Sequence, residues 1–461
     1  MKRKRRYYLL PLLPFLTILG FLAYLLVIMF ESEGPSLVLQ PLPEFLSKSQ
    51  NFTVKTGDEG RGLRFLKVSI QQGTRERMIL QEGFAFQGLL NVGGVHAYEK
   101  DFTIDPLTSK LAQGEAELQV QVWDHSKRGG GEGNSSIVRH KMIVDTIPPS
   151  VRAVSRMHNV NVGGSALAVY QTSSDAAESG VFVDEVFFPG FAAPENSTEG
   201  IHYCYFAIPH HIKSKPRIKL WARDKAGNMA ENSFDYHVRK RTFRIDKVVL
   251  SERFIGSILP YFTSFYPLDD QESPIGKFLK INRELRKENH ELLYRLKDNT
   301  STERLWEGTW LRQKNAANRA RFGDHRLYYY EREKVDEQDH LGVDLASLAN
   351  AAVEAANHGR VIYADRLGIY GLTVVLDHGQ GLMSVYGHMS KIDVSLGQEV
   401  RKGTVLGLTG NTGLAAGDHL HFAIMVSGIY VNPIEWWDDH WIEDHVSRKL
   451  GLGGQASGPK G

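Results

Sequence analysis

The chain has 461 residues, with 55 lysines and arginines against 53 aspartates and glutamates. This length predicts about three folded units, and the near balance of charge gives no indication of a nucleic-acid partner. The single cysteine, Cys204, cannot form an intrachain disulfide, and we interpret it as an unpaired thiol without a catalytic role. Repeated alternation of apolar and polar residues predicts a multidomain, mainly β protein.

The N-terminus combines a basic cluster with a long apolar run. Residues 2–6 are all lysine or arginine, and residues 7–30 contain no charged side chain. As a helix, the apolar run would reach about 36 Å, which exceeds the roughly 30 Å core of a bilayer. We therefore predict a transmembrane helix within residues 1–35, with its basic tip in the cytoplasm. The expected localisation is the cytoplasmic (inner) membrane, single-pass, with the bulk of the chain extracytoplasmic or periplasmic. A cleaved signal peptide is the alternative.

Two segments after the anchor have the pattern of β-modules. In residues 36–147 the stretch 116–123 alternates in polarity before Asp124 and a glycine-rich turn. In residues 148–246 the stretch 217–223 alternates in the same way before Asp224. The two modules loosely resemble bacterial immunoglobulin-like β-sandwiches, which would offer surfaces for envelope protein partners.

A helical connector is expected over residues 247–319. Ser273 and Pro274 are typical of a helix N-cap and first turn. The apolar residues that follow fit one helical face: Ile275, Phe278, Leu279, Leu285, Leu292, Leu293 and Leu296. This helix could link domains within the chain or pair with a partner. Residues 442–461 are predicted to be a flexible, glycine-rich tail.

Two short motifs near the C-terminus combine histidine with carboxylate. Residues 340–344 read HLGVD and residues 419–422 read HLHF. On a strand, side chains two and four residues apart share one face, so each motif would present its polar residues together. Zinc binds imidazole nitrogen and carboxylate oxygen, and catalytic zinc sites use three protein ligands plus a water. The spacing favours a metal site, although either motif alone is weak in a chain with 18 histidines.

These motifs belong to an ordered set spread over roughly a quarter of the chain. The other members are Arg321–Gly323, Tyr386–Ser390, Gly397–Gly403, Gly410–Gly413 and Val431–Pro433. In this order they resemble the lysostaphin/LytM-type zinc metallopeptidases, which cut peptide bonds in peptidoglycan. The resemblance implies an antiparallel β metallopeptidase domain at residues 320–441, holding one Zn²⁺ per chain. One departure is Asp418, where many relatives carry proline.

The resemblance also assigns roles to individual residues. His340, Asp344 and His421 would bind the zinc, while His388 and His419 would be the catalytic histidines beside it. We expect His419 to act as general base and His388 to contact the water or the developing oxyanion, although the two roles could be exchanged.

The function expected from the resemblance is that of a membrane-anchored zinc metalloendopeptidase hydrolysing peptide cross-links of peptidoglycan. One alternative is a non-catalytic LytM-like activator of a separate cell-wall hydrolase; such relatives typically lose ligands that this chain keeps. Another is a peptidase of extracytoplasmic proteins. The stretch 273–319 lies directly before the metal motifs, so one hypothesis is that it covers the cleft and restrains activity.

Overall fold

The structure, a computed structural model, describes residues 12–193 and 200–455. They fall into two compact units: Met1–Pro148 with Lys225–Asn228, and Pro149–Asp224 with Met229–Gly461. The boundaries expected at residues 246 and 319 fall inside the second unit and stay predictions.

Two sheets in the first unit enclose an apolar core that includes Phe52, Leu66 and Val120. The strand orders are β1-β3-β6 and β2-β8-β7-β4-β5. Side chains along β7 are alternately buried and half-buried, as the sequence predicts. The likeness to immunoglobulin-like modules is not confirmed. The elements are α1 (Leu12–Met29), β1 (Ser36–Gln40), β2 (Phe45–Leu46), β3 (Gln50–Gly57), β4 (Leu63–Gln72), β5 (Arg75–Gly83), η1 (Leu89–Asn91), β6 (Ala97–Ile104), β7 (Gly114–Asp124), η2 (Gly129–Gly131) and β8 (Ser135–Val144).

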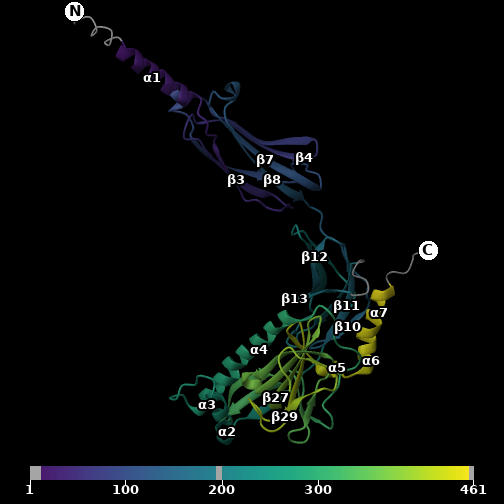
Figure 1. Ribbon diagram of the computed structural model, residues 1–461. Helices are drawn as coiled ribbons and strands as arrows, with labels where there is room; N and C mark the ends of the chain where they lie inside the picture. The colour runs from purple at the N-terminus through teal and green to yellow at the C-terminus, as the bar shows by residue number, and fades with distance from the viewer. Residues whose placement is uncertain (1–11, 194–199, 456–461) are drawn as a thin grey trace, which may run out of the picture. The chain divides into compact units, whose positions relative to one another are not determined.

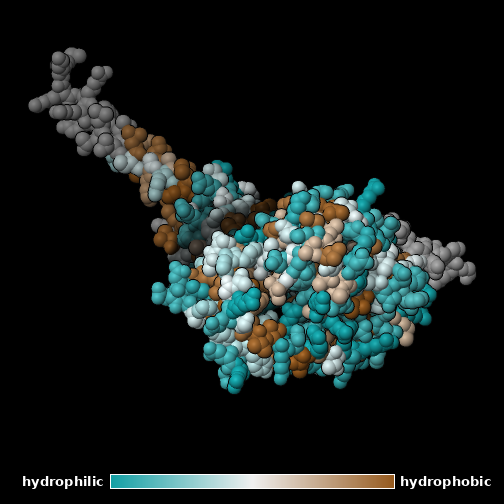
Figure 2. Space-filling model, turned by 90° about the horizontal axis from the view of Figure 1, so that it is seen from below, coloured by the Kyte–Doolittle hydropathy of each residue, from teal (hydrophilic) through white to brown (hydrophobic). Residues whose placement is uncertain are grey.

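The expected membrane-spanning segment, residues 7–30, is helical over α1, and residues 7–11 lie outside the described residues. Large apolar side chains such as Phe15, Phe21 and Val27 are exposed on α1. Figure 2 accordingly shows brown, hydrophobic surface along much of this helix. In the described part of the chain, no helix combines the length and hydropathy required for a membrane crossing. The predicted anchor is therefore not confirmed.

The second unit begins with a β-module of short strands in three sheets. The strand orders are β10-β18, β14-β15-β11-β9 and β13-β12-β16-β17. The alternating stretch at 217–223 forms most of β16, again as predicted. The strands are β9 (Val151–Ala153), β10 (His158–Asn161), β11 (Ser165–Thr172), β12 (Ala176–Val183), β13 (Val186–Pro189), β14 (Phe191–Ala192), β15 (Ile201–Ala207), β16 (Ile218–Asp224), β17 (Met229–Asn232) and β18 (Tyr236–Arg239).

The connector consists of one strand followed by a series of helices. Ser273 caps α3 as predicted, because its hydroxyl accepts the N–H of Gly276 at 3.2 Å. The buried face also carries Asn282 and Asn289, two polar residues that the apolar pattern does not include. The elements are β19 (Ile245–Val249), α2 (Glu252–Thr263), α3 (Pro274–Lys280), the π-helical turn η4 (Ile281–Leu285), α4 (Arg286–Arg295) and η5 (Leu296–Asn299).

The C-terminal part is built on a ten-stranded sheet with the order β20-β23-β30-β27-β26-β25-β28, to which β24, β29 and β31 are attached. A separate three-stranded sheet has the order β19-β21-β22, so β19 of the connector pairs with β21. The elements are β20 (Ala317–Ala320), β21 (His325–Tyr330), β22 (Glu333–Asp339), β23 (Val343–Ala346), β24 (Ala352–Glu354), β25 (Gly359–Arg366), η6 (Gly368–Tyr370), β26 (Leu372–Gly379), β27 (Leu382–Ile392), β28 (Glu399–Val400), β29 (Val405–Thr409), β30 (Leu420–Val426), β31 (Ile429–Val431), α5 (Pro433–Trp436), α6 (Asp439–Ile442), the π-helical turn η7 (Glu443–Ser447) and α7 (Arg448–Gln455).

One apolar core runs through the whole second unit. It includes Leu167 of the β-module, Leu293 of the connector, and Val385 and Ile424 of the C-terminal sheet. The β-module, connector and sheet therefore stabilise one another by shared burial.

The segment expected to be a flexible tail, residues 442–461, contains η7 and α7 up to Gln455, the last described residue, and its flexibility stays a prediction. Val446 is buried, and the ammonium of Lys449 donates to the carbonyl of Leu167 at 3.1 Å. In Figure 1, α7 accordingly lies beside β11. These contacts hold the segment in helical form despite its glycines.

Candidate metal centre

Strand pairing brings the two histidine motifs together. β23 and β30 are antiparallel, with Asp344 directly opposite His421. On its other edge β30 pairs with β27, where Gly387 stands opposite His421. His340 lies just before β23, and the backbone bends at Gly342. The strand register thus places His340, Asp344 and His388 around His421.

Three donor atoms converge as the sequence predicts. Nε2 of His340 lies 2.9 Å from Oδ1 of Asp344 and 3.2 Å from Nδ1 of His421. The last pair, Nδ1 of His421 and Oδ1 of Asp344, is 3.0 Å apart. A tetrahedral zinc ion with bonds of about 2.0–2.1 Å would hold its ligand atoms about 3.3–3.4 Å apart. The three atoms therefore fit around one such ion after a shift of a few tenths of an ångström.

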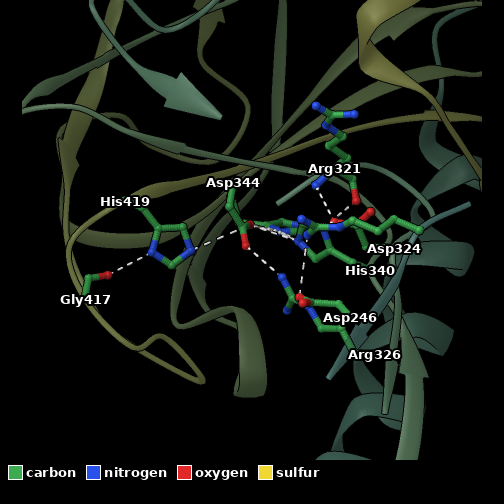
Figure 3. Close-up of polar contacts among 10 residues, drawn as sticks. Asp246, Arg321, Asp324, Arg326, His340, Asp344, Gly417 and His419 are labelled. Carbon is green, nitrogen blue, oxygen red and sulfur yellow. Dashed lines mark hydrogen bonds and ion pairs between the residues drawn. The ribbon is translucent and has the colours of Figure 1, made fainter. Parts of the chain in front are cut away.

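The protonation pattern also suits a cation. Nδ1–H of His340 donates to the carbonyl of Arg321 at 3.0 Å, so in the neutral ring Nε2 carries the lone pair that a metal ion would use. Oδ2 of Asp344 accepts from Nη2 of Arg326 at 3.1 Å, which leaves Oδ1 free to act as a single ligand atom. Figure 3 shows Arg326 and His419 reaching Asp344 from different sides. Outer hydrogen bonds of this kind orient the ligands of metal sites.

The surroundings of His421 and Asp344 determine the ionisation of these two residues. Burial lowers the pKa of His421 to about 4, so the ring is neutral near pH 7. For Asp344, burial alone would raise the pKa, but the charge and hydrogen bond of His340 hold it well below its usual range. Neutral imidazole and ionised carboxylate are the forms that bind metals.

Gly342 makes room for the ring of His421. A Cβ at residue 342 would stand 2.5 Å from both Cε1 and Nε2 of that ring. Any side chain here would displace His421 or the bend that precedes β23. The glycine of the HLGVD motif is therefore needed for close packing.

The two candidate catalytic histidines lie beside the donors. Nδ1–H of His419 donates to the carbonyl of Gly417 at 2.8 Å, and its Nε2 lies 3.6 Å from Oδ1 of Asp344. Nδ1–H of His388 donates to the carbonyl of Thr412 at 2.8 Å. The centroids of the two histidine rings are 4.8 Å apart. In the neutral form, each ring therefore carries its proton on Nδ1 and its lone pair on Nε2.

The two rings differ in backbone and charge. His388 has φ +61°, a left-handed conformation that is uncommon for histidine and is held here by β27. Burial, reinforced by His419, lowers the pKa of His388 well below its usual range. Burial also acts to lower the pKa of His419, but its hydrogen bond to Asp344 and the charge of that carboxylate raise it overall.

One cavity of about 610 Å³ contains all five predicted site residues in its lining. Asp418 also lines it, but its carboxylate accepts from the hydroxyl of Thr409 at 2.6 Å and the N–H of Asn350 at 3.1 Å. Asp418 therefore links neighbouring segments by hydrogen bonds and adds no ligand atom to the predicted metal site.

Sequence reasoning did not identify several residues around the cavity. The ring of Tyr370 lies tilted against that of His421, with centroids 5.2 Å apart, and its hydroxyl lies 3.0 Å from Nε2 of His290 on α4. Asn289 accepts the N–H of Ile369 at 2.8 Å. The connector helix thus forms part of the cavity wall. Neither these residues nor Arg326 lie in a local motif that could have revealed them.

The fold and the site define a metallopeptidase-type β domain. Residues 338–433 form a domain of peptidase family M23. The C-terminal part of the chain is 38% identical over 110 residues to the murein hydrolase activator EnvC of Escherichia coli, covering 24% of this chain and 26% of EnvC. It is 38% identical over 96 residues to the peptidoglycan DD-endopeptidase ShyA of Vibrio cholerae, covering 21% of this chain and 22% of ShyA. The chain thus spans about a quarter of the length of these relatives.

The fold also resembles solved structures. A putative peptidase of the same family from Pseudomonas aeruginosa matches with 24% identity and a TM-score of 0.37, covering 59% of this chain and 93% of that one. The catalytic domain of lysostaphin from Staphylococcus simulans matches with 25% identity and a TM-score of 0.24, covering 27% and 93%.

Proposed function

We propose that this protein is a zinc metalloendopeptidase that hydrolyses peptide cross-links of peptidoglycan on the extracytoplasmic side. The observation that carries the proposal is the convergence of His340, Asp344 and His421, with donor atoms at most 3.2 Å apart, beside two further histidines. A purely structural metal site does not require two additional imidazoles in the same cavity, whereas a catalytic site does require groups that can accept and donate protons.

When bound, zinc would supply Lewis acidity that polarises the scissile carbonyl and favours ionisation of water. His419 is placed to accept the proton of the attacking water at Nε2, because Gly417 fixes its proton on Nδ1. His388 has the same tautomer through Thr412. It can therefore accept a proton from water, and it can donate to an oxyanion only after it has itself been protonated. Either histidine could then return the proton to the leaving amine.

A second candidate function is activation of a separate cell-wall hydrolase. The observation in its favour is the 38% identity to a protein named as a murein hydrolase activator. The intact donor set and both cavity histidines argue for catalysis by this chain itself. A peptidase of extracytoplasmic proteins would use the same residues and differs only in substrate.

Digestion of purified sacculi tests the three possibilities. The zinc-loaded protein should release soluble fragments without any other hydrolase, and mass spectrometry should show newly formed peptide termini. Asp344→Ala should release none, whereas Asp365→Ala, which removes an exposed carboxylate elsewhere in the sheet, should act like the parent. Release of fragments only after another hydrolase is added would support the activator function. Cleavage of secreted proteins from a test panel, but not of sacculi, would support a peptidase of extracytoplasmic proteins.

A further inference from the structure

A second cavity of about 640 Å³ adjoins the one at the metal centre. The two cavities share Arg286, His290 and Leu341 in their linings. The second is walled by α4, by His210 and His211 of the β-module, and by β31. Most of this wall lies outside residues 338–433, so it is a feature of this chain's additional segments.

The lining of the second cavity is basic, with four lysines or arginines of η4 and α4 against one acidic residue. Two of these cations already have partners. Asp336 pairs with Arg283 at 3.1 Å, and Glu291 pairs with Lys287 at 3.9 Å. The other two cations take part in none of the ion pairs formed within residues 12–193 and 200–455.

These unpaired cations are Arg286 and Arg295, at the two ends of α4. Their positions are about 14 Å apart along the helix axis. Arg286 is half-buried and is held in place by Asn282, whose carbonyl accepts from Nε at 3.1 Å and whose Oδ1 accepts from Nη2 at 2.6 Å. A fixed guanidinium without a carboxylate partner is suited to bind one from a ligand.

Arg286 is also the charged residue where the cavities meet. Burial, followed by the charge of Arg286, lowers the pKa of His290 to about 3, so this ring is neutral, and Leu341 is apolar. Arg286 is therefore the charged side chain that a substrate lying in both cavities would meet.

We propose that the second cavity is a subsite for a carboxylate-bearing peptide arm of the substrate. Arg286 binds the carboxylate nearer the scissile bond, and Arg295 binds one farther along the arm. This inference rests on the proposed function and deepens it, since the stem peptides of peptidoglycan carry free carboxylates. Bidentate pairing of guanidinium with carboxylate gives both affinity and register.

Two synthetic substrates test the subsite: a cross-linked muropeptide dimer with free carboxylates, and the same dimer with those groups amidated. The full chain should cut the free-acid dimer with a KM at least about tenfold lower than that of the amidated dimer. Arg286→Ala should raise KM for the free acid about tenfold with little change in kcat, and should leave KM for the amidated dimer unchanged. Arg286→Lys should recover part of the difference because it retains the charge.

Arg253→Ala is the matched control, since it removes an exposed cation of α2 that is not part of either lining. Binding of both dimers is measured in parallel by calorimetry, and melting temperatures establish that each variant is folded. A free-acid preference in binding without turnover would sink the hydrolase proposal and leave the subsite standing. Three outcomes would overturn the subsite. The first is equal KM and equal binding for the two dimers, and the second is an Arg286→Ala variant with the same KM values as Arg253→Ala. The third is that neither dimer binds.

Discussion

Asp339 accepts a hydrogen bond from Nε2 of His210 at 2.9 Å, which joins β22 to the β-module one residue before the predicted ligand His340. Its other oxygen accepts from Nδ1 of His325 at 2.7 Å. These contacts, that with His210 foremost, lower the pKa of Asp339 to about 2. The approach of His340 to the metal centre is therefore fixed partly by residues far outside the matched family segment.

The first prediction concerns metal content. Asp344→Ala removes one of three ligands and the only anionic one, so zinc retained at matched free zinc should fall by more than about tenfold. Elemental analysis of the purified variant measures this, and circular dichroism checks that the β structure is kept. One zinc per chain in a triple variant, His340→Ala with Asp344→Ala and His421→Ala, would show that the metal is bound elsewhere.

The second prediction separates catalysis from metal binding. His419→Ala and His388→Ala should each retain zinc, because neither ring is among the three converging donors. Turnover of sacculi should fall by about 10²- to 10⁴-fold, the usual contribution of general acid–base catalysis. A variant that digests at the parental rate with zinc bound would remove that histidine from the mechanism.

The third prediction concerns the packing behind the metal centre. Gly342→Ala places a methyl group 2.5 Å from the ring of His421, so the ring must shift and zinc affinity should fall at least about tenfold. Competition with a chromophoric chelator measures the affinity. Gly256→Ala on α2 is the control, because its added Cβ meets nothing within 4 Å. Equal zinc affinity in the two variants would mean that the bend at residue 342 adapts freely.

The fourth prediction concerns the connector. A fragment of residues 320–441 loses β19, the α4 wall, and the buried rings of Trp306 and Trp310. Each large apolar side chain contributes about 1.5–3 kcal/mol by burial, and a whole domain is stable by only about 5–15 kcal/mol. We therefore expect the fragment to unfold at much lower temperature than the unit that starts at Pro149, which calorimetry can compare directly.

The same pair of proteins tests whether the connector restrains activity. A folded fragment that turns over sacculi faster than the longer protein would support restraint. A fragment that melts like the longer protein would show that the connector contributes little to stability.

The sequence identified the three residues whose donor atoms converge, His340, Asp344 and His421, and it predicted several local elements. The spacing of the histidine motifs, the cap at Ser273 and the alternation along β7 each depend on neighbours a few residues away. Local chemistry of this kind is visible in a single sequence. The placement of His388 came from the resemblance alone, whereas the spacing of the HLHF motif also placed His419 beside His421.

What the sequence did not reveal depends on distant contacts. Arg326 meets Asp344 only through the folding of two strands, and Asn289 is polar on a face expected to be apolar because it binds the backbone of Ile369. The C-terminal helix is held by Lys449 against Leu167, a partner 282 positions earlier. No pattern within a short window encodes such pairs.

The unbroken core of the second unit also bears on how such proteins can recombine. Glu435 of α5, which follows the last strand of the C-terminal sheet, accepts from Asn161 at 2.8 Å and from the backbone N–H of Ser165 at 3.0 Å, so its contacts depend on the presence of the β-module. A crossover at residue 338 would separate co-adapted surfaces, whereas one near Pro149 would carry them together. The part of the chain that must be exchanged as a whole is thus the second unit, which is larger than the family match at residues 338–433.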